Sequence, residues 1–171
     1  ADAIITGLWT AYRFDKPFSI FRQIRPNANY WTGWDFGGTH LFPGGNLSLY
    51  VQFKNLWWTN IGGNYEGNSI SNSLLRGGPS MLYPSSLNGW FNLGTNSSRK
   101  VYATLWANAA RGAEDVSERY SAGMDFTVKP GQSFTATVTP SLSRNRNDIQ
   151  YVTRTDEGGR YILSQINQQI V

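Results

Sequence analysis

Apolar and polar residues alternate along most of the chain, which is the pattern of β-strands with one apolar and one polar face. In the clearest stretch, residues 132–143, Phe134 and Val138 fall on one side and Thr135 and Thr137 on the other. No helical period competes over a long window. The alternation predicts about nine strands, over residues 8–14, 24–36, 47–54, 57–66, 87–94, 101–109, 120–128, 132–143 and 160–171.

The connections between these strands are expected to differ in length at the two ends of the sheet. At one end, residues 54–55, 96–99 and 129–131 predict short turns, because they are rich in turn-forming Asn, Ser, Pro and Gly. At the other end the sequence predicts longer connections, over residues 37–46, 67–86, 113–119 and 144–159. Short turns on one side and long loops on the other are typical of outer-membrane β-barrels.

The two faces of the predicted strands differ in charge. Within the predicted limits the apolar faces carry no charged residue, whereas the polar faces, rich in Asn, Ser, Thr and Gly, carry Arg13, Arg25, Asp35, Lys54, Glu66 and Asp125. A basic residue on the lipid-facing side of a barrel strand costs about 2–4 kcal/mol near the middle of the bilayer. We therefore predict an all-β fold, an antiparallel up-and-down transmembrane β-barrel whose apolar face contacts outer-membrane lipid.

This orientation predicts where two sets of residues lie. Aromatic residues near the strand ends should form rows at the membrane interfaces: Trp34, Phe36, Trp57, Tyr65, Tyr120 and Phe126. Apolar residues between them should be accessible, because lipid rather than protein covers them: Leu47, Leu49, Val51, Phe91, Leu93, Leu105, Phe126, Phe134 and Val138. A soluble β-sandwich also alternates. Burial of most of these residues in a central core would favour that alternative.

Composition narrows the functional classes. Charged residues make up only 15% of the 171 residues, aromatic residues also 15%, and the net charge of +4 is scattered rather than clustered, so we expect no nucleic-acid partner. There is no Cys, hence no disulfide and no thiolate metal site. The sequence contains no apolar run long enough for a transmembrane helix and no signal peptide at Ala1. Residues 1–171 are expected to form one β-barrel segment, with no cofactor.

From about Asn55 onward the sequence resembles a known family through three stretches and one turn. The stretches are Leu-Arg-Gly-Gly-Pro at 75–79, Ser-Leu-Ser-Arg-Asn-Arg-Asn-Asp-Ile-Gln-Tyr-Val at 141–152 and Arg-Tyr-Ile-Leu-Ser-Gln-Ile at 160–166, and the turn is Phe-Lys-Asn-Leu-Trp at 53–57. They resemble the C-terminal barrel, a domain of unknown function, of large bacterial outer-membrane proteins whose N-terminal region is similar to a family-nine carbohydrate-binding module. The resemblance implies a bacterial outer-membrane location.

Family members are several-fold longer than this chain, which lacks their N-terminal region and the strands expected after Val171. An odd number of strands is also unusual for a single-chain bacterial barrel. We therefore expect a partial barrel, completed by missing parts of the same barrel or by other envelope proteins. In that arrangement the strands near Leu8 and Ile166 do not pair with each other. A closed barrel of about nine strands would also be too narrow for four tryptophans pointing into it.

Two groups of residues are candidates for function. The first is the middle of the longest predicted loop, where Gly and Pro can fold the backbone inward as a plug or constriction; the alternatives are a purely structural plug and a ligand contact. It comprises Leu75, Arg76, Gly77, Gly78 and Pro79. The second lies on the polar faces of the strands, where aromatic rings and amides can hold glycans; the alternative is a filled polar interior. It comprises Trp31, Trp58, Trp90, Trp106, Asn60 and Asn92.

No catalytic residues are predicted. His40 is the only histidine, and no Ser and carboxylate are placed beside it by the sequence. No spaced acidic motif supports a metal site. The expected function is therefore a non-enzymatic pore, receptor or anchor of the bacterial outer membrane, in glycan handling or an envelope complex. Two alternatives stay open: a soluble secreted β-sandwich that binds carbohydrate, and an outer-membrane hydrolase, which would need a nucleophile within hydrogen-bond reach of His40.

Overall fold

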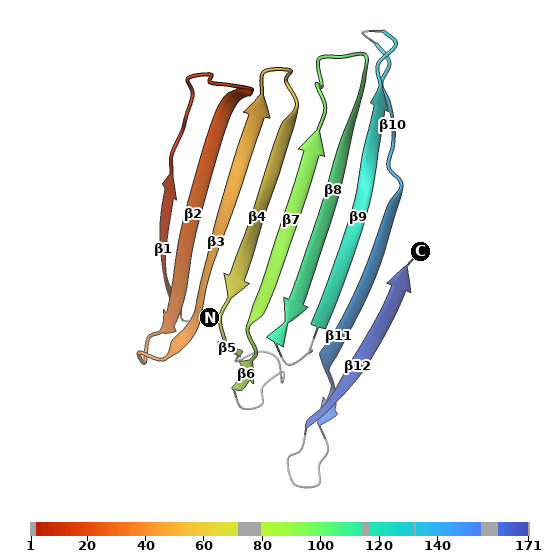
Figure 1. Ribbon diagram of the computed structural model, residues 1–171. Coiled ribbons are helices and arrows are strands. Elements are labelled where there is room, and N and C mark those ends of the chain that lie inside the picture. Colours follow the sequence, from red (N-terminus) through yellow and green to blue (C-terminus); the bar gives the residue numbers. More distant parts are fainter. Residues whose placement is uncertain (1–2, 72–79, 114–116, 132, 155–160, 171) are drawn as a thin grey trace.

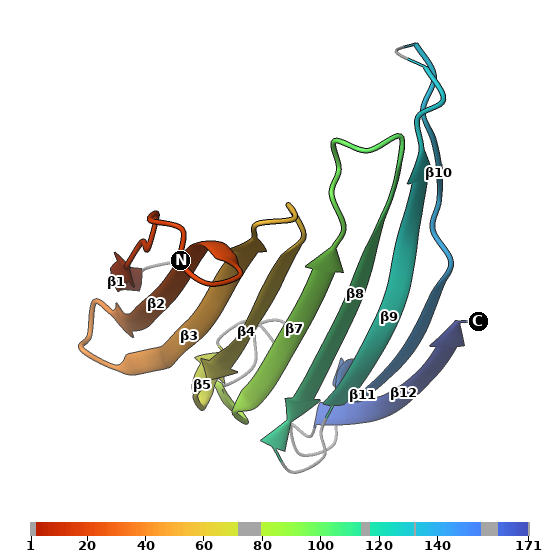
Figure 2. The same cartoon turned by 45° about the horizontal axis from the view of Figure 1, so that its top comes forward.

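The chain forms a wide antiparallel sheet in the computed structural model, which describes residues 3–71, 80–113, 117–131, 133–154 and 161–170 (Figure 1). The strands are β1 (Ala3–Ala11), β2 (Phe21–Asp35), β3 (His40–Phe53), β4 (Trp58–Glu66), β5 (Ser69–Ser71), β6 (Met81–Tyr83), β7 (Ser86–Gly94), β8 (Val101–Gly112), β9 (Ser117–Val128), β10 (Ala136–Val138), β11 (Ser141–Arg154) and β12 (Tyr161–Ile170). They lie side by side in one layer, which is twisted and curved rather than flat (Figure 2).

The strand order is that of an up-and-down meander. The large sheet runs β1-β2-β3-β4-β7-β8-β9-β11-β12, with every neighbouring pair antiparallel. β5 and β6 form a separate two-stranded hairpin inserted between β4 and β7. The predicted all-β fold and the antiparallel order are confirmed, whereas the predicted strand 132–143 divides into β10 and the start of β11.

The sheet is open. β1 and β12 lie at opposite ends of the strand order, and within the described ranges no pairing joins them. The prediction that the strands near Leu8 and Ile166 do not pair is therefore confirmed.

A proline interrupts the strand that runs beside β9. Val138 of β10 faces Phe126, and Ser141 of β11 faces Gly123, so the register against β9 is unchanged across the break. Pro140 lies in this break and has no N–H to donate, but its carbonyl still accepts a 3.1 Å hydrogen bond from Met124 N. β10 and β11 thus follow one course beside β9.

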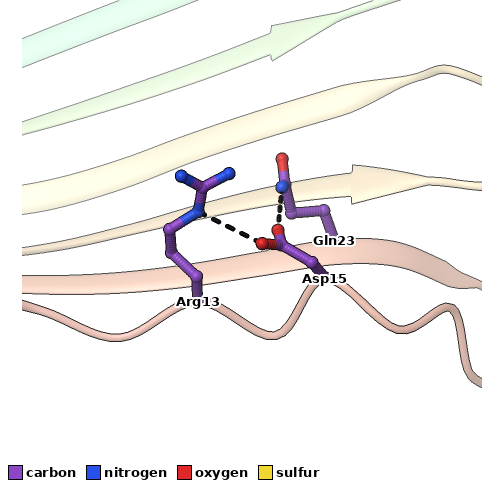
Figure 3. Close-up of polar contacts among 3 residues, drawn as sticks. All are labelled: Arg13, Asp15 and Gln23. Atoms are coloured by element: carbon purple, nitrogen blue, oxygen red, sulfur yellow. Dashed lines mark hydrogen bonds and ion pairs between the residues drawn. The ribbon is translucent and has the colours of Figure 1, made fainter.

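The connection between β1 and β2 is tied to the sheet by an exposed polar cluster (Figure 3). The Asp15 carboxylate lies 3.2 Å from Nε of Arg13 and also accepts a hydrogen bond from the side-chain amide of Gln23 on β2. Both partners of the ion pair are more than half exposed, so solvent screens it and its contribution to stability is small. The cluster orders this connection at the upper end of the sheet in Figure 1.

The predicted contrast in connection lengths is wrong in most places. At the lower end in Figure 1, β2 and β3 are separated only by residues 36–39, and β9 begins at Ser117, soon after β8 ends at Gly112. Residues 144–154, predicted as loop, belong to β11. The strands extend past their apolar stretches because backbone pairing continues through polar and charged residues. Only the connection from β4 to β7 remains long at this end, and the upper connection after β9 is long as well.

The sheet has almost no buried core. In the part of the chain that the structure describes, Val51 is the sole buried hydrophobic residue, and no second sheet packs on the first as a β-sandwich requires. Those residues also contain no helix long and apolar enough to cross a membrane. Such a sheet cannot derive its stability from a protein interior. Its stability therefore depends on what contacts each of its two faces.

Candidate functional site: the two faces of the sheet

One face of the sheet is apolar and accessible over its whole width. Cross-strand pairing aligns Pro26, Leu49, Ile61, Phe91 and Ala107 in one row, with Ala122 and Leu142 continuing it. Neighbouring rows hold Leu47, which is 69% exposed, and Leu105, which is 45% exposed. We call this the apolar face.

The predicted accessibility of the apolar residues is confirmed for eight of the nine. Leu47, Leu49, Leu105, Phe126, Phe134 and Val138 are exposed, Phe91 and Leu93 are half-buried, and Val51 is 7% exposed. Val51 is the exception because it lies near the end of β3, against which the segment before β2 folds. Lys54 N donates to the carbonyl of Ile20 at 2.9 Å, and the rings of Phe21 and Phe53 lie 5.7 Å apart.

Aromatic residues border the apolar face at both ends. Tyr30, Tyr65 and Tyr120 are exposed towards its lower end, and Trp57 and Phe126 are exposed towards its upper end. Between Tyr120 and Val128 on β9 the strand covers about 27 Å, at about 3.4 Å per residue. For a barrel strand tilted by about 40°, this length corresponds to a height of about 20 Å, somewhat less than the apolar band of an outer-membrane barrel, which is about 25 Å.

Beyond the predicted strand limits the apolar face does carry charged residues. Because the strands extend further than predicted, their lower ends place Arg111, Glu118 and Arg146 in one cross-strand row, beyond Tyr120. Arg144 faces Tyr120 in the row above. The charges thus lie at the lower edge of the face, and its middle rows remain uncharged.

The opposite face, which we call the polar face, carries the predicted tryptophans, and each lies over a glycine of the neighbouring strand. A Cβ atom built on any of these glycines would overlap the facing indole ring. The pairs are Trp31 with Gly44, Trp58 with Gly94, Trp90 with Gly62 and Trp106 with Gly123, and Phe42 covers Gly33 in the same way. Aromatic residues are known to stabilise cross-strand glycines by covering their exposed backbone.

These pairs change the interpretation of the tryptophans. A ring over a glycine lies against the sheet rather than pointing away from it, so four tryptophans require less interior volume than predicted. The width of the barrel therefore stays a prediction, and the bulk of these rings alone does not decide it. All four side chains are half-buried, since the sheet covers one part of each ring and leaves another accessible.

Two of the indole rings are also held by hydrogen bonds. Trp90 Nε1 donates to Oδ1 of Asn60 at 2.6 Å, and Trp31 Nε1 donates to a Glu66 carboxylate oxygen at 3.3 Å. Asn92 is adjacent in register to both Asn60 and Trp106. The structure thus brings together Trp58, Trp90, Trp106, Asn60 and Asn92 on β4, β7 and β8, with Trp31 separated from them by β3.

A row of four asparagines crosses the polar face next to this cluster. Asn29, Asn46, Asn64 and Asn88 are aligned in register on β2, β3, β4 and β7. Asn29 donates to Asn46 at 2.6 Å, and Asn64 donates to Asn88 at 2.9 Å, whereas Oδ1 of Asn64 has no partner among the described residues. A row of neutral amides supplies donors and acceptors without net charge, as a water-filled lumen requires.

The predicted plug residues, 75–79, lie outside the described residues. Their flanks are anchored at the lower end of the sheet. Gly67 N donates to the Pro43 carbonyl at 2.8 Å, and Ser85 N donates to the side chain of Asn68, also at 2.8 Å. Tyr83 of β6 lines a hollow of about 190 Å³ with Arg119 and Asn145 of the polar face. β6 therefore reaches the polar side, but the role of residues 75–79 stays a prediction.

The ring of His40 lies within hydrogen-bond reach of the Thr32 hydroxyl. Its Nε2 lies 2.9 Å from the hydroxyl of Thr32, which is only 4% exposed and so is inaccessible to a substrate. The nearby Asp35 carboxylate accepts a 2.7 Å hydrogen bond from Thr39 N, and this contact lowers the pKa of Asp35. The carboxylate is thus engaged by the turn at 35–39. Within the described part of the chain, no group of three or more acidic, His or Cys residues could hold a metal ion.

Comparison with protein families, with curated proteins and with solved structures finds no match to this chain. The family resemblance through residues 53–57, 75–79, 141–152 and 160–166 therefore stays an expectation from the sequence.

Proposed function

We propose that this chain forms part of the wall of a transmembrane β-barrel in the bacterial outer membrane and acts there without catalysis, as a pore, receptor or anchor. The observation that carries the proposal is the single layer of strands with one accessible apolar face and one polar face. A water-soluble protein rarely exposes an apolar surface of this extent. Lipid on the apolar face and water on the polar face would stabilise both.

The open edges of the sheet support a barrel made from more strands than these. In a bilayer each unpaired backbone group costs several kcal/mol, so an open sheet edge is not tolerated in contact with lipid. β1 and β12 each pair on one side only in the described residues. We propose that strands of the same protein outside residues 1–171, or strands of another envelope protein, pair with these edges.

The absence of Cys allows a direct test of the two faces, because single cysteines can be introduced without background. In native outer membranes, Asn92→Cys and Thr104→Cys should react with a membrane-impermeant maleimide, since their side chains belong to the polar face. Phe91→Cys and Leu105→Cys, one residue away on the same strands, should react only after detergent is added. Equal labelling of all four variants in membranes would contradict the barrel.

Fractionation of the full-length protein provides an independent test. The protein should sediment with the outer membrane, remain there after carbonate washing and dissolve only in detergent, because lipid contacts hold it. Recovery in the soluble fraction, or release by carbonate, would instead favour a secreted protein.

A second candidate function is binding of a neutral glycan on the polar face. The observation that favours it is that indole rings lie over glycines with their positions fixed, beside amides of Asn60 and Asn92. Apolar faces of sugar rings stack on such rings, and hydroxyl groups bond to amides. The middle of the polar face carries few charges, which suits a neutral ligand.

Titration with maltohexaose and cellohexaose tests the second candidate, using intrinsic tryptophan fluorescence of the detergent-solubilised protein. Trp106→Ala should weaken binding about three- to tenfold, since an aromatic contact contributes about 0.5–1.5 kcal/mol. Trp57→Ala removes an exposed indole from the apolar face and should leave the affinity unchanged. If neither oligosaccharide changes the fluorescence of the parent protein, the candidate is lost while the barrel proposal stands.

A further inference from the structure

A hollow of about 460 Å³ lies at the upper end of the apolar face, between the turns that join β3 to β4 and β7 to β8. Two exposed aromatic residues, Trp57 and Phe126, line it from either side. Thr95 and Ala103 lie between them in the strand order, and the Thr95 hydroxyl accepts a 2.9 Å hydrogen bond from Ala103 N. Two small side chains between two aromatic rings therefore leave the hollow.

The rim of this hollow carries a cation and two amides. Arg99 is the charged residue among those that line it, and Asn55 and Asn96 line it from the two turns. Arg99 is exposed, and its backbone N–H donates to the carbonyl of Asn96 at 3.1 Å. The side-chain oxygens of both asparagines accept backbone hydrogen bonds within their turns, which leaves their NH₂ groups as donors. An apolar hollow thus ends at groups that can bind an anion.

The connections around the hollow contain further cations and no carboxylate. Lys54 and Lys100 are exposed in the two turns, and Lys129 begins the connection after β9. Neither the two turns nor residues 129–135 contain Asp or Glu. On β4, β7, β8 and β9 the nearest acidic residue is Asp125, whose side chain belongs to the polar face. No acidic residue of these connections therefore opposes the binding of an anion at the hollow.

We propose that this hollow binds an anionic phospholipid, with the phosphate at Arg99 and an acyl chain against Ala103 between the two aromatic rings. The inference rests on the proposed membrane location of the apolar face and adds a lipid-selective site to it. Trp57 and Phe126 border the apolar face at this end, as aromatic residues do at a membrane interface, so Arg99 lies at the level of the headgroups. A guanidinium group there binds phosphate oxygens through paired N–H donors and gains affinity for anionic lipid.

Native mass spectrometry of the full-length protein in neutral detergent tests the site, with phosphatidylglycerol and phosphatidylcholine as probes. The parent protein should bind phosphatidylglycerol more tightly, and equal binding of the two lipids would overturn the proposal. Arg99→Gln should reduce the preference about fivefold, because one attractive charge is removed. Arg99→Lys keeps the charge and should retain most of the preference.

Arg22→Gln is the matched control. Arg22 is also exposed at the upper end of the sheet, but it lies on β2, which β3 separates from β4 and the hollow. This variant should behave as the parent protein. An equal loss of preference in Arg22→Gln would show a general attraction of this end for anions and would contradict a site at the hollow. An unchanged preference in Arg99→Gln would contradict it as well.

Ala103→Leu tests the hollow independently of charge. The larger side chain occupies the space beside Phe126, which faces Ala103, and it stays apolar on the apolar face. Phosphatidylglycerol binding should weaken about threefold or more, because the acyl chain loses contact with the hollow. Unchanged binding would refute the proposed acyl-chain contact.

Glycerol 3-phosphate separates a lipid site from a site for free phosphate, because it carries the phosphate without acyl chains. Added in excess, it should not displace phosphatidylglycerol from the parent protein. Displacement would assign the site to a free phosphate ester and overturn the proposal. A parent protein that does not associate with membranes contradicts the barrel proposal instead.

Discussion

Leu105→Arg is expected to reduce the stability of the membrane-inserted protein by about 2–4 kcal/mol. Leu105 lies in a middle row of the apolar face, between Leu93 and Met124, and is 45% exposed in the isolated chain. If lipid covers it, a guanidinium group at this depth must lose hydration or distort the bilayer. The measurement is urea-induced unfolding of the full-length protein from neutral lipid vesicles, followed by tryptophan fluorescence.

Thr104→Arg is the control for this experiment. Thr104 precedes Leu105 on β8, and its side chain belongs to the polar face opposite Asp125. A water-filled interior accepts the new charge, so the unfolding free energy should change by less than about 1 kcal/mol. Equal losses for the two variants would mean that both faces are packed against protein, which would contradict lipid contact at Leu105.

Gly62→Ala is expected to destabilise the protein by about 1–3 kcal/mol, as added atoms do in tightly packed sites. The new methyl group would overlap the indole ring of Trp90 and lie 2.8 Å from the carbonyl oxygen of Leu47. The ring can move, but the backbone oxygen belongs to the β3 ladder and cannot move without breaking strand pairing. The same urea titration measures the loss.

Gly89→Ala provides the comparison, because Gly89 lies on β7 and faces Gly63, next to Gly62 on β4. A Cβ atom there would meet only the carbonyl oxygen of Gly62, at an ordinary 3.5 Å. This substitution should be neutral or stabilising by up to about 1 kcal/mol, since alanine restricts the unfolded chain. A loss at Gly89 as large as that at Gly62 would show that glycine is required for strand geometry rather than for room beneath Trp90.

Alternation in the sequence predicted the strands and the direction of most side chains, because a pleated strand separates successive residues onto opposite faces. The segments around Leu47, Phe91, Leu105 and Phe126 illustrate this. In each segment, the residues on either side of the apolar one belong to the opposite face. An error of one residue in the alternation would therefore have assigned every side chain of that strand to the wrong face. The turn predicted at 54–55 is present, and Asn55 accepts a hydrogen bond from Trp57 N. The positive φ of 67° at Leu56 was not predictable from its residue type.

The ends of the strands could not be predicted in the same way. Arg111, Glu118 and Arg144 interrupt the apolar alternation, and charged residues near Gly or Ser resemble loop sequence. They are nevertheless in strands because pairing along β8, β9 and β11 continues through them. The position at which a strand ends is determined by backbone hydrogen bonds to a segment that is distant in the sequence. The alternation of residues within one segment does not reveal those hydrogen bonds.

The glycine–aromatic pairs of the polar face were also beyond prediction from the sequence alone. Trp90 and Gly62 are separated by 27 residues and meet only through the register of β4 and β7. The sequence identified Trp31, Trp58, Trp90 and Trp106 as polar-face residues, but their partners depend on which residues face each other across strands. Each ring was therefore expected to project into the interior instead of covering a neighbouring backbone.

These five pairs have a consequence for how the sheet selects its alignment during folding. A slip of one residue between strands turns apolar side chains to the wrong face, but a slip of two keeps every residue on its proper face. The alternation of apolar and polar residues therefore does not disfavour a slip of two residues. The tight turns at 54–57 and 95–100 fix the alignment of β3 with β4 and of β7 with β8.

The pairs occur at other strand junctions: two between β2 and β3, two between β4 and β7, and one between β8 and β9. The second of these junctions follows the long connection at 67–85, which cannot impose an alignment by itself. A two-residue slip there would place the indole rings of Trp58 and Trp90 over asparagines and leave both glycines uncovered. Shape complementarity between ring and glycine thus favours the observed alignment of the strands over the alignment displaced by two residues.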